Sequence, residues 1–319
     1  MKRILNITNG DATVDLMHQA KIPGDFLPWQ DVLHEGPVPG GLSLKELSTV
    51  RAWYIAKQGW ATKHDAVKNF QQRDDTIFSF SDYDQVILWF ENDLYDQLQL
   101  LQILDWLIKH DWGKTNITII CEDSYLGLLS AKEIIRLQKT AKPVTGDQVM
   151  LAEKAWNAFC AKTPDKIISM LDEPTEALPF LHNAFIRLME EYPSVKNGLS
   201  RTEQQALKLI KSGVSNPIEI FNQSQAMEDH VFMGDTVFWT KLKQLTTCNP
   251  PLLDTTEGPL TPRNIAHQAI TITQAGDEVL AGKNNFLEMT HLDHWLGGVH
   301  LYMKSSYCFD EASGILIQM

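Results

Sequence analysis

Acidic side chains follow three short apolar segments of the N-terminal half, each at the point where the segment ends. Residues 4–8, 86–90 and 117–121 are rich in β-branched or aromatic residues, which predicts three strands. The polar residues directly after them are Asn9-Gly10-Asp11, Glu91-Asn92-Asp93 and Glu122-Asp123. In an open parallel sheet the carboxyl ends of the strands lie along one edge, where ligands bind. We therefore expect these carboxylates to converge on one site.

Carboxylates gathered at one edge of a sheet are suited to a divalent cation, because Mg²⁺ and Mn²⁺ prefer oxygen ligands. We predict Asp11, Glu91 and Asp93 as metal ligands, and Asn9 and Gly10 as contacts of the substrate. No glycine-rich phosphate loop with a lysine follows any of the three strands, so a phosphate would reach this site through the cation. The alternative for each acidic residue is helix capping, in which it accepts backbone N–H bonds and binds no ligand.

The segment from Asp31 to Pro37, with the sequence DVLHEGP, adds two carboxylates and an imidazole. Histidine has an unperturbed pKa of about 6.5, so it exchanges protons readily at neutral pH. We predict His34 and Glu35 as the catalytic acid–base residues and Asp31 as a further substrate contact. The alternative for His34 is a loop histidine that is hydrogen-bonded to the backbone.

Leucines recur at helical spacing over residues 93–110, which predicts an amphipathic helix directly after the second strand. Gln97 falls inside the apolar stripe of this helix, where an amide without partners costs about 1–3 kcal/mol. Gln97 therefore either joins a buried polar network or lines a ligand cavity, and we predict the cavity. Asp96, Gln99 and Gln102 fall on the other side of the helix and are predicted to be solvated.

Alternating strands and helices over residues 1–142 predict an α/β domain with a mainly parallel, Rossmann-like sheet. Residues 25–30 are expected to add a strand at the sheet edge, because Pro28 cannot donate to a neighbouring strand.

Three further segments follow this domain. The pattern becomes purely helical over residues 143–195, which predicts a helical connector. Three helices and a β segment over residues 196–290 resemble a winged-helix module, an α+β unit, and Ser200 and Glu203 have capping-box spacing at its start. Residues 291–319 are expected to form a β hairpin that packs back on the first domain, which would make His300 a contact of the substrate.

The composition disfavours several classes of partner. With 28 Lys+Arg against 40 Asp+Glu the net charge is −12, which disfavours binding to the phosphates of nucleic acids. Acidic residues also outnumber basic ones between Ser200 and Thr290, so the winged-helix-like module is expected to contact protein rather than DNA. No apolar run reaches the roughly 20 residues that span a membrane, and the N-terminus lacks the layout of a signal peptide.

The cysteines and histidines bear on the cellular location and on a possible zinc site. Four scattered cysteines without a CxxC pair predict reduced thiols in a cytoplasmic protein, and a homo-oligomer is compatible with the sequence. Near the C-terminus three histidines and a cysteine could hold zinc, but their spacing matches no compact zinc motif, and a chance cluster is favoured. These residues are His291, His294, His300 and Cys308.

The same motifs carry a resemblance to a known family. The chain has Asn9-Gly-Asp11, the DVLHEGP segment, and WFENDLYDQLQLL from Trp89 to Leu101. In these it resembles a bacterial family of uncharacterised proteins that is catalogued as a domain of unknown function. The resemblance covers roughly the first 125 residues and implies no mechanism.

Three functions are therefore carried forward, and whether the protein is an enzyme stays open. The leading hypothesis is a hydrolase or phosphoryl-transfer enzyme with an acidic, Mg²⁺- or Mn²⁺-dependent site acting on a nucleotide-like or other small polar molecule. The alternative is a non-catalytic small-molecule sensor that signals through the winged-helix-like module. The third is a structural partner protein whose acidic residues are helix caps.

Overall fold

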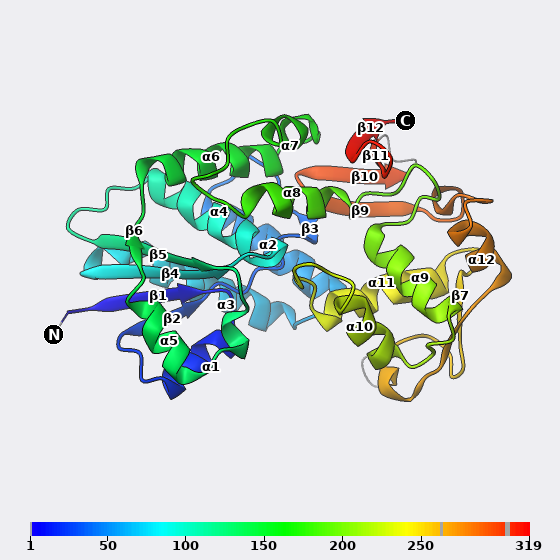
Figure 1. The fold of residues 1–319 in the computed structure, drawn as a ribbon, viewed down its shortest axis with the longest axis horizontal. Coiled ribbons are helices and arrows are strands. Elements are labelled where there is room, and N and C mark those ends of the chain that lie inside the picture. The colour runs from blue at the N-terminus through cyan, green and yellow to red at the C-terminus, as the bar shows by residue number, and fades with distance from the viewer. Residues whose placement is uncertain (1, 262–263, 304–306) are drawn as a thin grey trace. The chain divides into compact units, whose positions relative to one another are not determined.

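A five-stranded sheet organises the N-terminal half of the computed structural model, which describes residues 2–261, 264–303 and 307–319 (Figure 1). The strand order is β2-β1-β4-β5-β6, in which the first four strands are parallel and β6 runs antiparallel to β5. The strands are β1 (Ile4–Thr8), β2 (Asp25–Pro28), β4 (Gln85–Glu91), β5 (Asn116–Glu122) and β6 (Lys142–Pro143). The expected α/β class and mainly parallel sheet are confirmed. Pro28 ends β2, an edge strand, as its missing N–H predicts.

Helices cover both faces of this sheet (Figure 1). On one face, α1 and α5 bury an apolar cluster that includes Met17 of α1, Ile87 and Trp89 of β4, and Ile134 of α5. On the other face lies α4, and α6 packs against its outer side. The bounds are α1 (Asp11–Gln19), α4 (Leu94–Ile108), α5 (Ala131–Gln138), α6 (Gly146–Phe159) and α7 (Asp165–Met170).

The predicted helix after β4 is present as α4, but its predicted solvated side is wrong. Asp96, Gln99 and Gln102 are 0 %, 0 % and 2 % exposed. The reason is that α4 is covered from outside by neighbouring elements, α6 above all. Polar residues on one side of a helix can bind other protein groups as well as water. Here the Trp29 indole N–H donates to Gln102 Oε1 at 2.7 Å.

A pair of helices that the sequence analysis did not identify, α2 (Leu44–Gln58) and α3 (Lys63–Phe78), lies between β3 (Gly36–Pro37) and β4 in the chain. Each begins at a hydroxyl cap, with Ser43 accepting from Glu46 N and Thr62 accepting from Asp65 N. The pair places two buried arginines, described below, beside the segment of residues 31–37.

The chain divides into two compact units. Unit 1 comprises the residues up to Phe185 together with Gly297–Val299, so α6 and α7 belong to it, and unit 2 comprises Ile186–Leu296 and His300–Met319. The boundary lies within α8 (Leu181–Met189). No helix in the described part of the chain combines the length and the apolar character needed to cross a membrane.

Unit 2 contains three consecutive helices followed by two antiparallel strands. The Ser200–Glu203 capping box is formed at the start of α9, as predicted. The described part of residues 291–319, predicted as one hairpin, forms four strands, of which β11 and β12 pair as a hairpin. The bounds are α9 (Arg201–Lys211), α10 (Pro217–Gln225), α11 (Asp235–Thr247), β7 (Leu253–Thr255), β8 (Ile270–Ile272), α12 (Gln274–Leu280), β9 (Leu292–Gly297), β10 (Val299–Met303), β11 (Tyr307–Asp310) and β12 (Ile315–Gln318).

Candidate functional site

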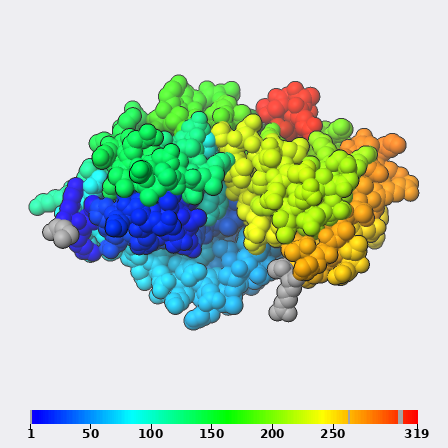
Figure 2. Space-filling view, turned by 60° about the horizontal axis from the view of Figure 1, so that its bottom comes forward, coloured from blue at the N-terminus to red at the C-terminus, as the bar shows by residue number. Residues whose placement is uncertain are grey.

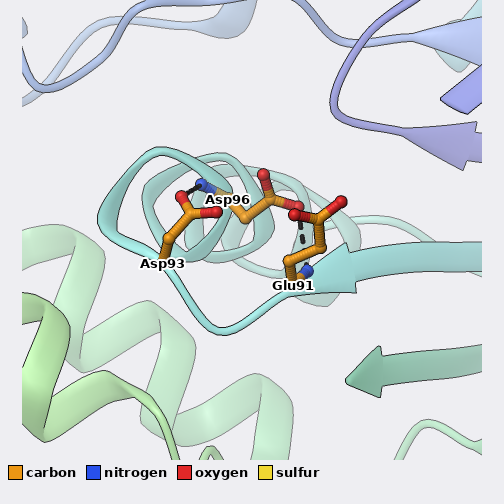
Figure 3. A group of neighbouring side chains, drawn as sticks. All are labelled: Glu91, Asp93 and Asp96. Carbon is orange, nitrogen blue, oxygen red and sulfur yellow. Dashed lines mark hydrogen bonds between the residues drawn. The ribbon is translucent and has the colours of Figure 1, made fainter. Parts of the chain in front are cut away.

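Three carboxylates meet where β4 gives way to α4 (Figure 3). Glu91 is the last residue of β4, Asp93 is the N-cap of α4, and Asp96 lies in its first turn. One oxygen from each lies within 4.8 Å of the others. All three side chains are buried. Among the described residues they form the one group of three potential metal ligands; the histidines near the C-terminus and Cys308 form none. We call Glu91, Asp93 and Asp96 the acidic group.

Backbone and amide hydrogen bonds fix the acidic group. Asp93 Oδ1 accepts from Asp96 N at 3.1 Å, so the capping alternative is confirmed for Asp93. Asp96 Oδ1 in turn accepts from Glu91 N at 2.8 Å, which ties the first turn of α4 to the end of β4 (Figure 3). Glu91 Oε1 accepts from Leu126 N at 2.8 Å. Capping thus accounts for one oxygen of Asp93 and not for the meeting of three carboxylates.

Asn9 joins the end of β1 to the acidic group. Its Nδ2 donates to Asp96 Oδ2 at 2.8 Å, and its Oδ1 accepts from the Thr13 hydroxyl at 3.1 Å. Adjacent parallel strands β1 and β4 therefore end at the same place, as expected. Gly10 follows as the N-cap of α1.

Asp11, predicted as a metal ligand, lies outside the acidic group. It is exposed in the first turn of α1, which lies at the surface beside α5 (Figure 2). After β1 it is the Asn9 side chain that reaches the acidic group, whereas Asp11 is the first residue of α1.

Within residues 2–261, 264–303 and 307–319, no basic side chain pairs with the acidic group. None of the ion pairs in the described part of the chain involves Glu91, Asp93 or Asp96. Burial, with the charge of Asp93 added, raises the pKa of Glu91 to about 7. Burial raises the pKa of Asp93 to about 7 as well. Burial and then the charges of Asp93 and Glu91 raise the pKa of Asp96 well above its usual value. The raised pKa values mean that the group holds protons at higher pH than ordinary carboxylates do.

Asp31, predicted as a substrate contact, is paired with two arginines. Asp31 is fully buried, and its Oδ1 accepts from Arg51 Nε at 2.8 Å. Arg73 Nη1 lies 3.7 Å from the other oxygen. Arg51 also donates to the backbone oxygens of Val32 at 2.7 Å and Glu35 at 2.8 Å. Asp31 therefore holds two arginines that fix the segment of residues 31–37.

That segment places His34 beside the first turn of α4. The His34 ring is buried and meets the Tyr95 ring edge-on, with centroids 5.9 Å apart, and Tyr95 directly precedes Asp96. Burial and then the Asp96 and Asp31 charges raise the pKa of the Tyr95 hydroxyl. Glu35 is buried as well. The structure thus brings one of the two predicted acid–base residues, His34, next to α4.

Gln97 is buried as predicted, but its amide serves a network and not a cavity wall. Its Nε2 donates to the Glu91 backbone oxygen at 2.6 Å and lies 3.4 Å from Cys121 Sγ. Gln97 therefore fixes the end of β4 against the end of β5, and the network alternative is the one observed. Asp123, after β5, accepts from the Asn92 side chain.

His300 lies in unit 2. Its ring stacks on Trp295, with centroids 4.2 Å apart, and its Nε2 lies 2.8 Å from Asp293 Oδ1.

The member of the acidic group that sequence reasoning missed is Asp96. Its signal was present in the spacing Glu91-x-Asp93-x-x-Asp96, because a residue three positions after an N-cap faces back toward that cap.

Comparison of the chain with protein-family models and with curated proteins found no match. The functional argument therefore depends on the geometry of the site.

Proposed function

We propose that the protein is a metal-dependent hydrolase or phosphoryl-transfer enzyme whose Mg²⁺ or Mn²⁺ is bound by Glu91, Asp93 and Asp96. The observation that carries the proposal is the 4.8 Å limit on the separation of their ligand atoms. Oxygens on opposite sides of one Mg²⁺ lie about 4.2 Å apart, and those around one Ca²⁺ about 5 Å apart. Adjacent oxygens around one Mg²⁺ lie about 3 Å apart, so the three carboxylates would close by up to about 1–2 Å around one ion.

Charge supports the same proposal. Three buried carboxylates that have no lysine or arginine partner among the described residues repel one another, and a divalent cation replaces that repulsion with attraction. The hydrogen bonds to the Glu91 side chain end on Oε1, so its Oε2 remains for a cation. Asn9 holds Asp96 in position from β1, and Gln97 holds the backbone of Glu91. A carboxylate set fixed in this way loses little freedom when it binds an ion.

The proposed chemistry uses the residues next to the acidic group. A bound cation lowers the pKa of a water ligand, which supplies a nucleophile at neutral pH. We assign His34 to proton transfer, with Glu35 as its neighbour in the same buried segment. Asn9 and Gly10 lie at the end of β1, where a nucleotide-like or other small polar substrate would contact the sheet edge.

Thermal unfolding in the presence of Mg²⁺ or Mn²⁺ tests this proposal. A cation at 100 times its Kd should stabilise the native protein by about 2.7 kcal/mol. Asp96→Asn should abolish the stabilisation, because it removes a ligand while keeping a side chain of the same size. Asp11→Asn is the matched control and should leave it unchanged, because Asp11 lies outside the acidic group. Absence of stabilisation in the unsubstituted protein, or its survival in Asp96→Asn, overturns the proposal.

One observation favours the second candidate, a sensor with a winged-helix-like module. Helices α9, α10 and α11 followed by the antiparallel strands β7 and β8 have the element order of such a module. DNA is the less favoured partner, because Lys241 of α11 is buried and its Nζ lies 3.0 Å from Glu191 Oε2. Salt-dependent retention on DNA that is lost in Lys243→Ala would support DNA binding, and retention without that dependence would count against it.

A further inference from the structure

Unit 2 contains a cavity of about 620 Å³ that the proposed enzyme function does not use. Ligand sites for small molecules have volumes of about 300–1,000 Å³, so this one is large enough for such a molecule. Its walls come from α9, α11 and the chain from Phe286 to His294. The cavity lies within unit 2, whereas the acidic group lies in unit 1.

One wall of the cavity is fixed to two other parts of unit 2. Phe286 N donates to Asn197 O at 2.8 Å, and Asn249 N donates to Met289 O at 3.3 Å. Gly198 permits this approach: it has φ +75°, and a Cβ there would lie 2.3 Å from Asn285 Oδ1. The cavity is therefore bounded by hydrogen-bonded chain on the side of residues 285–289.

The basic group that lines the cavity is already neutralised. Lys241 is buried and pairs with Glu191, which also accepts from Arg187 Nη1 at 2.9 Å. Burial by itself would raise the pKa of Glu191, but Lys241 and Arg187 hold it well below its usual value. An anionic ligand would therefore meet a lysine whose charge is occupied.

Carboxylates dominate the remaining charge of the lining. Glu203 is buried at the start of α9, and Glu288 and Asp293 are exposed on the chain that forms the opposite wall. Among the described residues that line the cavity, Lys241 is the only lysine or arginine. Asp293 is bonded to His300 at 2.8 Å. Glu203 Oε2 accepts from Ser200 N at 2.8 Å, and the charge of Lys241 acts on Glu203 as well, so its Oε1 and the carboxylate of Glu288 are the acidic groups for a ligand. Phe286, Leu292 and Leu301 supply apolar surface between them.

From this lining we infer that unit 2 binds a small amine-bearing molecule, with its ammonium or guanidinium group at Glu203 and Glu288 and its carbon chain along Phe286. The inference is independent of the metal site, because it uses no residue of unit 1. It also fits the sensor alternative, in which a ligand acts on the unit that contains α9 to α11.

Isothermal titration of the full chain with putrescine, spermidine and L-arginine tests the inference, with inorganic phosphate as the anionic comparison. At least one amine should bind with a Kd below about 1 mM and more weakly at high salt. Glu203→Gln should weaken that binding by about tenfold, a loss of about 1.4 kcal/mol. Glutamine retains the capping box with Ser200, so α9 should keep its start. Glu219→Gln, on the exposed side of α10, is the charge-matched control.

A second pair of variants distinguishes a residue of α11 that lines the cavity from a neighbour that does not. Thr246 and Thr247 both donate to Lys243 O, at 2.8 and 3.0 Å, but Thr247 lines the cavity and Thr246 does not. Thr247→Trp should fill part of the cavity and weaken amine binding by about tenfold. Thr246→Trp should leave the affinity unchanged. The inference is overturned if none of the amines binds, if phosphate binds in their place, or if the two tryptophan variants behave alike.

Discussion

Each unit buries a set of carboxylates, and the two sets differ in their partners. In unit 2, Arg187 and Lys241 form ion pairs with Glu191 and Glu228, at distances of 2.7 to 3.0 Å; we call these four residues the Arg187 cluster. In unit 1, the acidic group has no basic partner among the described residues. The pKa of Glu191 is lowered, whereas those of Glu91, Asp93 and Asp96 are raised.

The difference indicates two purposes for buried charge. A compensated cluster fixes the fold, because removing one member leaves another buried and unpaired. An uncompensated group costs stability unless a proton or an ion joins it, and such costs are typical of functional sites. Asp31, which lies in unit 1 and pairs with Arg51 at 2.8 Å, belongs to the first kind despite its place in a predicted site segment.

The largest effect is expected from breaking the Arg187 cluster. Arg187→Met should lower the free energy of unfolding by about 3–5 kcal/mol, because it leaves Glu191 and Glu228 buried with fewer partners. Urea unfolding measures the loss. A cost below about 1 kcal/mol would show that this cluster is not the structural counterpart of the acidic group.

A smaller loss is expected at Asp31. Asp31→Asn should cost about 1.5–3 kcal/mol, the range for hydrogen bonds to charged groups, because it weakens the bonds that fix Arg51. The Asp31→Asn variant should bind Mg²⁺ with the affinity of the unsubstituted protein. Loss of cation binding with little loss of stability would move Asp31 into the functional set.

The pH dependence of stability should have opposite signs in the two sets. Because the native pKa of Asp93 is about 7 and the ordinary pKa of an aspartate is 3.8, the native protein binds extra protons between these pH values. Its stability in the absence of a cation should therefore fall as pH rises toward 7, by about 1.4 kcal/mol per pH unit for each extra proton bound. For Glu191 the sign reverses. Its lowered pKa stabilises the native protein at pH values above the unfolded-state pKa, and this stability is lost as the pH falls.

Asp93→Asn isolates the acidic group in that experiment. Asparagine caps helices as well as aspartate does, so α4 should keep its start. The variant should gain stability relative to the unsubstituted protein as pH rises from 5 to 7, by up to about 1.4 kcal/mol per pH unit. Parallel pH profiles for the two proteins would show that Asp93 does not bear the raised pKa.

The smallest effect is expected at Asp11. Asp11→Asn should change stability by no more than about 0.5 kcal/mol, as for most surface substitutions, because its side chain is exposed. A large loss in thermal unfolding would mean that Asp11 has a partner in solution that its place in α1 does not indicate.

Local signals in the sequence predicted those parts of the fold that depend on neighbouring residues. Residues 4–8 form β1 with the predicted bounds, Pro28 lies on an edge strand, and Ser200 forms the predicted capping box. Each of these depends on residue types within a few positions. Glu91 and Asp93 were placed correctly at the end of β4 for the same reason.

The sequence was less informative where elements distant in the chain determine the surroundings of a side chain. Asp96 was predicted to be solvated because helical periodicity does not show that Asn9 and the end of β4 bind its carboxylate. The arginine partners of Asp31, Arg51 and Arg73, were not foreseen because they lie in two helices that the pattern did not identify. Gln97 was predicted at a cavity, whereas its partner is the backbone of Glu91.

A Mn²⁺ titration followed by electron paramagnetic resonance of the free ion tests the central claim most directly. The account predicts one site per chain that is lost in Asp96→Asn and retained in Asp11→Asn. Below pH 7 the affinity should fall, because protons compete for Glu91 and Asp93, whose pKa values are about 7. An unsubstituted protein that leaves all Mn²⁺ free at pH 8, or an Asp96→Asn variant that still binds it, would contradict the account.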